Sequence, residues 1–195
     1  MTQENYLKSL ELESKRYKKE KDLFDIIVYG SFVRGKRKSN DIDVVFIFNN
    51  TSLEKRAEIT QKFKQNIKSK NKNIKIDVKT INLHELFSEE FFARQGIIIE
   101  GYSLLDKKPL QEKLGFESFE AFVIETKSLS NTKKVRFSYA LNGRGEEKGF
   151  LEKVSGKRIS QKVILIPIKN SELFREFLEK MEIKFKSEHI IMPKK

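Results

Sequence analysis

Hydrophobic residues in the first hundred positions recur with two spacings, one of two residues and one of three to four. Short apolar runs between polar turns, and one strictly alternating stretch, predict strands over residues 23–29, 42–48, 73–81 and 97–100. Helical spacing between them predicts helices over residues 2–21, 53–68 and 82–93. The first part of the chain is therefore predicted to be a sheet with helices packed on one face.

A change of pattern follows at residues 101–109, where turn-forming residues interrupt the apolar spacing. We expect a domain boundary there, with one domain over residues 1–106 and a second over residues 107–195. In the second domain the spacing predicts helices over residues 118–127, 132–141 and 171–181, and strands over residues 162–168 and 183–191. Both parts mix helices with strands, so the predicted fold class is α+β, with a small α+β C-terminal domain.

Composition excludes several classes of protein. The chain has 195 residues, 38% of them hydrophobic, and no cysteine. Disulfides, thiolate zinc sites and cysteine nucleophiles are therefore excluded. The sequence has no apolar run near the roughly 18 residues that a membrane helix needs, and its N-terminus lacks the apolar region of a signal peptide. We therefore expect a cytoplasmic protein that does not enter a membrane.

Positive charge is concentrated in the second half. The chain carries 40 Lys and Arg against 28 Asp and Glu, a net charge of +12. Residues 107–195 hold 20 basic and 12 acidic residues, which makes this part the better candidate for contact with RNA or DNA. A Lys-rich surface that only keeps the protein soluble is the alternative. The candidate nucleic-acid contacts are Lys36, Arg37, Lys153, Lys157 and Arg158.

Acidic residues and a Gly-Ser turn follow the predicted strands. Gly30 and Ser31 come directly after the apolar run 23–29, and Asp41 and Asp43 open the run 42–48. Carboxylates two residues apart in a strand lie on the same face, where they can share a divalent cation. Asp77, the one acid of the alternating stretch, faces away from its apolar neighbours. We expect it to supply a third carboxylate from an adjacent strand.

The segment GSFVRGKRKSNDIDVVF resembles the signature of the DNA polymerase beta-like nucleotidyltransferase superfamily, and the likeness extends over about residues 23–101. The resemblance implies a palm-like mixed sheet and two Mg²⁺ or Mn²⁺ ions. It implies that Asp41 and Asp43 bind both ions, and that Asp77 completes one ion's site and activates the acceptor hydroxyl. It also implies that Gly30 and Ser31 contact the β- and γ-phosphates of a nucleoside triphosphate. Arg34, in the basic loop nearest to them, is expected to neutralise phosphate charge.

The resemblance leaves the acceptor open. A metal-dependent nucleotidyltransferase could transfer a nucleoside monophosphate (NMP) to an RNA or DNA 3′ end, which the basic C-terminal part favours. It could instead modify a partner protein, as minimal antitoxin-type relatives do. A non-catalytic binding protein on the same scaffold is the third alternative. The presence of three mutually repelling carboxylates argues against the third, because only a function would retain them. Only 29 residues precede Gly30, so templated synthesis is not expected.

Overall fold

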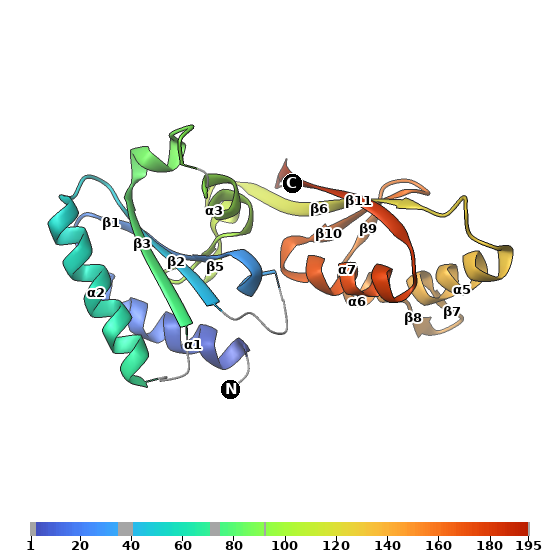
Figure 1. Ribbon diagram of the computed structural model, residues 1–195, viewed down its shortest axis with the longest axis horizontal. Helices are drawn as coiled ribbons and strands as arrows, with labels where there is room; N and C mark the ends of the chain where they lie inside the picture. Colours follow the sequence, from blue (N-terminus) through green and yellow to red (C-terminus); the bar gives the residue numbers. More distant parts are fainter. Residues whose placement is uncertain (1–2, 35–40, 71–74, 92, 195) are drawn as a thin grey trace. The chain divides into compact units, whose positions relative to one another are not determined.

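The chain divides into two compact units, Met1–Gly115 and Phe116–Lys195, in a computed structural model that describes residues 3–34, 41–70, 75–91 and 93–194 (Figure 1). Both units contain helices and strands, in agreement with the predicted α+β class. Within these described ranges, no helix is both long enough and apolar enough to cross a membrane. Each unit is described by itself below.

A five-stranded mixed sheet forms the centre of the first unit. Its strands run in the order β3-β2-β1-β4-β5. Their bounds are Leu23–Tyr29 for β1, Asp41–Phe48 for β2, Lys75–Asn82 for β3, Tyr102–Ser103 for β4 and Lys108–Pro109 for β5. Strand β1 is antiparallel to β2 and β4, whereas β2 and β3 are parallel. This order places the two predicted acidic strands next to each other.

Helices cover both faces of this sheet, whereas the sequence predicted helices on one face only. The two longest, α1 (Gln3–Ser14) and α2 (Leu53–Lys70), pack on one face against the side chains of Val28, Val44 and Phe46. The short helices α3 (Arg94–Glu100) and α4 (Leu110–Lys113) and the 3-10 turn η3 (Leu83–Phe87) pack on the other face. Burial on both faces explains why β1 and β2 are nearly continuous apolar runs. Figure 1 shows α2 and α3 on opposite sides of the sheet.

The boundary between the units lies at 115, nine residues later than the predicted boundary at 106. Strand β5 pairs with β4, and α4 returns to the first sheet. There the Lys113 Nζ lies 2.6 Å from Asp25 Oδ2 and 2.6 Å from Asp106 Oδ2. Asp25 is fully buried. The predicted boundary at 106 is too early because Lys113, which follows it, is paired with Asp25 of the first sheet, 88 positions earlier in the chain.

A four-stranded antiparallel sheet, in the order β11-β6-β10-β9, forms the second unit together with three helices. The strands are β6 (Phe116–Glu125), β9 (Lys157–Arg158), β10 (Val163–Pro167) and β11 (Lys184–Pro193). The helices are α5 (Asn131–Asn142), α6 (Phe150–Lys153) and α7 (Ser171–Lys180), and a hairpin of β7 (Gly143–Arg144) and β8 (Glu147–Lys148) follows α5. Phe122, Ile164 and Phe174 lie at the centre of its core.

Three further 3-10 turns are present in the two units. These are η1 (Lys15–Tyr17) and η2 (Gly30–Phe32) in the first unit and η4 (Ile168–Asn170) in the second.

Three predicted secondary-structure elements are wrong. Residues 118–127, predicted as a helix, lie largely in the strand β6, whose alternate residues Phe122 and Ile124 enter the core. The helix predicted over residues 82–93 is the short turn η3, which begins with a capping box between Asn82 and Glu85. The strand predicted over residues 97–100 is part of α3. Short apolar runs fit either period, and packing decides between them.

The buried carboxylate of Asp25 generates a stability prediction. Replacing Lys113→Ala should lower the free energy of unfolding by about 3–5 kcal/mol, because it leaves a buried charge unpaired. Burial already raises the pKa of Asp25. Without Lys113 the folded pKa of Asp25 should rise further, so the loss should grow as pH rises from the folded pKa of Asp25 in the wild type toward its higher folded pKa in the variant. Urea denaturation at several pH values measures it. Lys108→Ala, at an exposed position of β5, is the control, and equal losses in both variants would contradict the prediction.

Candidate functional site

The three predicted acids lie on one face of the first sheet. Asp41 is the first residue of β2, and Asp43 follows two positions later. Asp77 of β3 is the direct neighbour of Asp43 in the parallel register. Residues paired in this way on neighbouring strands have side chains on the same face. The fold therefore places Asp43 beside Asp77, with Asp41 one step along the same face of β2.

Tyr29 extends this row onto a third strand. It is the last residue of β1 and pairs with Asp43 in the antiparallel register. Its side chain is buried, and burial, followed by the negative charges of Asp43 and Asp77, raises the pKa of Tyr29 to about 12. A row of Tyr29, Asp43 and Asp77 thus crosses β1, β2 and β3. Sequence spacing alone does not reveal Tyr29, because its place in the row depends on the pairing of β1 with β2.

Burial and like charge act together on Asp43. Its pKa is raised, first by burial, and then by the neighbouring carboxylates of Asp77 and Asp41. Lys79 acts in the opposite direction and lowers this pKa. The ammonium group of Lys79 lies 3.7 Å from Asp77 Oδ2, and both side chains are about half exposed. Lys79 therefore supplies part of the positive charge that this acidic face requires.

The carboxylates form a set of hard oxygen donors, which suits Mg²⁺ or Mn²⁺. They do not converge as a closed cage: among the residues that the structure describes, no group of three or more His, Cys, Asp or Glu side chains has the geometry of a metal centre. Asp77 is instead engaged by Lys79. The carboxylate oxygens and their position on one face of the sheet fit a divalent cation. The raised pKa of Asp43 shows that its ionised form is destabilised, and a bound cation would stabilise it.

Gly30 connects the phosphate-binding candidate turn to this row. It has φ of +78°, a conformation that favours glycine, and opens the 3-10 turn η2. A Cβ atom built at this position would lie 3.0 Å from Asp43 Oδ2. The backbone of the turn therefore lies directly against the carboxylate of Asp43. The sequence predicted that the Gly-Ser turn and this acid lie side by side. Ser31, the next residue, is partly exposed.

Arg34 is held beside this turn by the end of α3. Its Nη1 donates to Glu100 Oε1 at 2.8 Å, and the side chain of Glu100 is 5% exposed. The Arg34 side chain keeps 28% of its surface exposed. No sequence pattern singles out Glu100, which is 66 positions from Arg34. Lys36 and Arg37, the other basic candidates in this loop, lie outside the described residues.

The predicted basic residues of the second unit do not all lie on one face. Lys153 is exposed at the end of α6, whereas Lys157 and Arg158 are consecutive residues of β9. Consecutive strand residues point to opposite faces. The ammonium of Lys157 lies 5.1 Å from the centroid of the Phe119 ring and 3.9 Å from Glu117 Oε2. Lys157 therefore makes its contacts with residues of β6, in the sheet of its own unit.

Comparison with known proteins identifies the first unit. Residues 14–107 match the family model described as polymerase beta, nucleotidyltransferase, and this segment includes Gly30, Asp41, Asp43 and Asp77. No curated protein matches the chain. One similar solved structure is that of the tri-AMPylated Shewanella oneidensis HEPN toxin in complex with MNT antitoxin. The similarity has 18% identity, 55% coverage of this chain, 78% coverage of that chain and a TM-score of 0.37. The family match shows that residues 14–107 of the first unit belong to the polymerase beta-like nucleotidyltransferase superfamily.

Proposed function

We propose that this protein transfers an NMP from a nucleoside triphosphate to an acceptor hydroxyl in a reaction that depends on a divalent cation. One observation carries the proposal. The register of β1, β2 and β3 places Asp43 beside Asp77 and brings the Gly30 turn against Asp43. A carboxylate pair and an adjacent glycine turn are the features that bind cations and phosphates together.

Asp41, Asp43 and Asp77 are the residues that would hold the cations. Bound Mg²⁺ or Mn²⁺ would neutralise phosphate charge and stabilise the attacking and leaving oxygens. Burial raises the pKa of Asp43, and the like charges of Asp77 and Asp41 raise it further, so a bound cation would stabilise the ionised carboxylate. Lys79 lowers the pKa of Asp43 and lies 3.7 Å from Asp77 Oδ2, so an incoming cation would compete with Lys79 for Asp77.

The Gly30-Ser31 turn would bind the triphosphate through its backbone N–H groups. Arg34, fixed by Glu100, would add a positive charge that needs no reorganisation when the nucleotide binds. Asp77 has a half-exposed side chain, so its carboxylate is accessible to an acceptor hydroxyl and would take the proton of that hydroxyl. The acceptor oxygen then forms a bond to the α-phosphorus, and the bond to the leaving pyrophosphate breaks.

An RNA or DNA 3′ end is the favoured acceptor because the chain carries a net charge of +12. A partner protein is the alternative acceptor. The experiment that tests the function also separates these acceptors. The purified chain is incubated with each α-labelled nucleoside triphosphate, Mg²⁺ or Mn²⁺, and RNA, DNA or protein in separate reactions, and the labelled macromolecule is identified.

Removal of one cation ligand should abolish that labelling. Asp43→Asn and Asp41→Asn should each reduce transfer by about a thousand-fold or more, because cation binding supplies several kcal/mol of transition-state stabilisation. The rate of label incorporation measures the effect. Asp22→Asn removes an exposed carboxylate of the same unit and should leave the rate unchanged. Near-normal transfer by Asp43→Asn would contradict the cation assignment, and no transfer by the wild type to any acceptor would contradict the function.

Cation binding should also be visible without turnover. Mg²⁺ should raise the midpoint of thermal unfolding of the wild type, with about 2.7 kcal/mol of stabilisation at a hundred-fold excess over its dissociation constant. The Asp43→Asn variant should lose most of this shift. In EDTA the same variant should be at least as stable as the wild type, because like-charge repulsion and the burial of a charge are relieved. Equal Mg²⁺ shifts in both proteins would place the cation elsewhere.

Gly30→Ala tests the contact between the turn and Asp43. The new Cβ would meet Asp43 Oδ2 at 3.0 Å, so transfer should fall by roughly a hundred-fold if the carboxylate is displaced. The positive φ adds a stability cost of about 1–2 kcal/mol. Gly115→Ala is a matched control, because Gly115 has φ of +77° and nothing within 4 Å of a built Cβ. Both variants should lose similar stability, and only Gly30→Ala should lose activity.

A further inference from the structure

The outward side of α5 carries hydrophobic side chains that the core does not use. Phe137 and Leu141 point into the core of the second unit. On the opposite side, Val135 is 51% exposed and Tyr139 is 49% exposed. These two residues are four positions apart, so they are neighbours on the helix surface. They line a shallow open depression together with Asn131, Thr132 and Arg136. We call these five residues, with Arg144 of the adjoining hairpin, the α5 surface.

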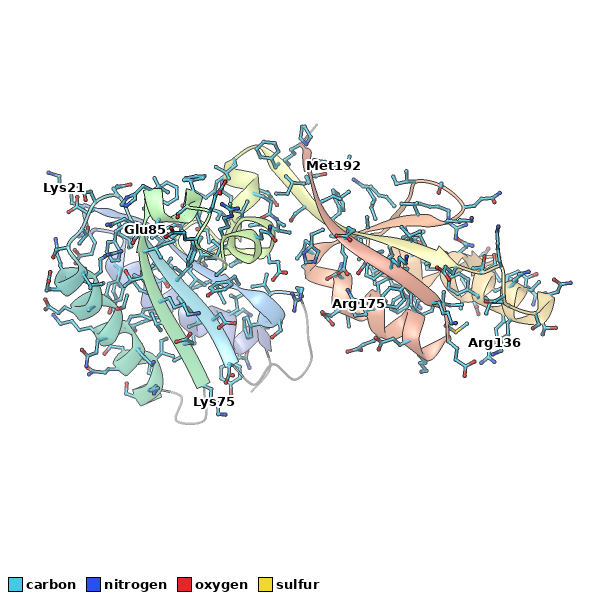
Figure 2. All side chains as sticks on the ribbon, turned by 45° about the horizontal axis from the view of Figure 1, so that its top comes forward. Lys21, Lys75, Glu85, Arg136, Arg175 and Met192 are labelled. Carbon is cyan, nitrogen blue, oxygen red and sulfur yellow. The ribbon has the colours of Figure 1, made fainter. Side chains whose placement is uncertain are left out.

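The α5 surface is also strongly basic. Helix α5 contains three basic residues and no acidic residue. Lys133 pairs with Glu182, but Arg136 projects from α5 (Figure 2) and has no carboxylate within ion-pair distance in the part of the chain that the structure describes. The guanidinium carbon of Arg144 lies 5.2 Å from the centroid of the Tyr139 ring. A basic side chain thus lies over an exposed aromatic ring.

We propose that the α5 surface binds single-stranded nucleic acid. Tyr139 and the guanidinium of Arg144 are groups on which unpaired bases stack, and Arg136 supplies charge for the phosphates. The hairpin brings Glu146 and Glu147 nearby, but residues 131–148 still hold five basic residues against two acidic ones. That the bound strand is the acceptor of the transferred NMP rests on the proposed function.

The chemistry of the surface distinguishes a single strand from other occupants. A duplex presents mainly phosphates and paired bases, which give an exposed Val-Tyr stripe no apolar partner. A second copy of the chain would bring the same positive charges together, which opposes association. A single strand offers both a polyanionic backbone and unstacked base faces. It therefore complements the apolar and basic parts of the surface together.

Binding is measured by fluorescence anisotropy of labelled 20-nucleotide single-stranded RNA and DNA with the full chain in EDTA, so that catalysis plays no part. The double variant Tyr139→Ala/Arg136→Ala should bind roughly ten-fold or more weakly. Its salt dependence should also be flatter, with the slope of log K against log salt reduced by about 0.7 for each phosphate that the variant no longer neutralises. Both side chains are exposed, so thermal unfolding should be unchanged.

The matched control is Val123→Ala/Lys186→Ala, which removes one apolar and one basic side chain from paired positions of β6 and β11. It should bind as the wild type does. Equal binding losses in both double variants, or no loss in the α5 variant, would overturn the assignment. A wild type that self-associates through Tyr139 and Arg136 in sedimentation, and binds no oligonucleotide, would assign the surface to a second copy and overturn it as well.

The same proteins separate this inference from the proposed function. If the wild type binds no oligonucleotide but labels a protein acceptor, the α5 proposal fails and the nucleotidyltransferase proposal stands. If binding depends on Tyr139 and Arg136 while no triphosphate yields transfer, the surface stands and the proposed function fails. If both hold, Asp43→Asn should bind oligonucleotide normally yet transfer nothing, and the α5 variant should need more oligonucleotide to reach the wild-type rate.

Discussion

The parallel register of β2 and β3 is the constraint on which the candidate active site depends. It sets Asp43 beside Asp77, and the pKa of Asp43 is raised first by burial and then by the like charges of its acidic neighbours. The core fixes this register, because Ile76 packs among the apolar residues under α2. A slip of one residue would turn Asp77 into that core and Ile76 onto the acidic face. Hydrophobic packing on one side of the sheet thus holds the carboxylates together on the other.

Sequence patterns predict the first unit well where spacing alone determines the outcome. The alternation of residues 73–81 and the apolar run of residues 42–48 predict β3 and β2 correctly. The family match confirms the superfamily. The hydrogen bond from Arg34 to Glu100 and the place of Tyr29 could not be predicted. Both depend on the pairing of segments that are distant in the sequence. The roles of the site residues remain proposals that the variants test.

The second unit shows the limit of periodicity. In β6, residues such as Phe119 and Phe122 are buried although they belong to opposite faces of the strand, so the two-residue alternation is obscured and the pattern favours a helix. The basic candidates Lys157 and Arg158 are adjacent in sequence, but strand geometry separates them. On α5, helical spacing places Val135, Arg136 and Tyr139 on one side, and the packing of Phe137 into the core turns that side outward.

The distribution of charge relates the two units chemically. In the first unit Lys79 lies close to Asp77, and Arg34 is paired with Glu100. These two basic side chains near the site are therefore each paired with a specific carboxylate. A triphosphate and its cations balance much of each other's charge, and their binding needs no large basic surface elsewhere. The second unit, residues 116–195, holds 17 basic and 11 acidic residues, and the nucleotide does not account for this excess. The proposed polyanionic acceptor would account for it, because the affinity of such an acceptor rises with each phosphate that a Lys or Arg neutralises. The exposed ring of Tyr139 among those charges favours an acceptor with free bases over a small phosphorylated molecule.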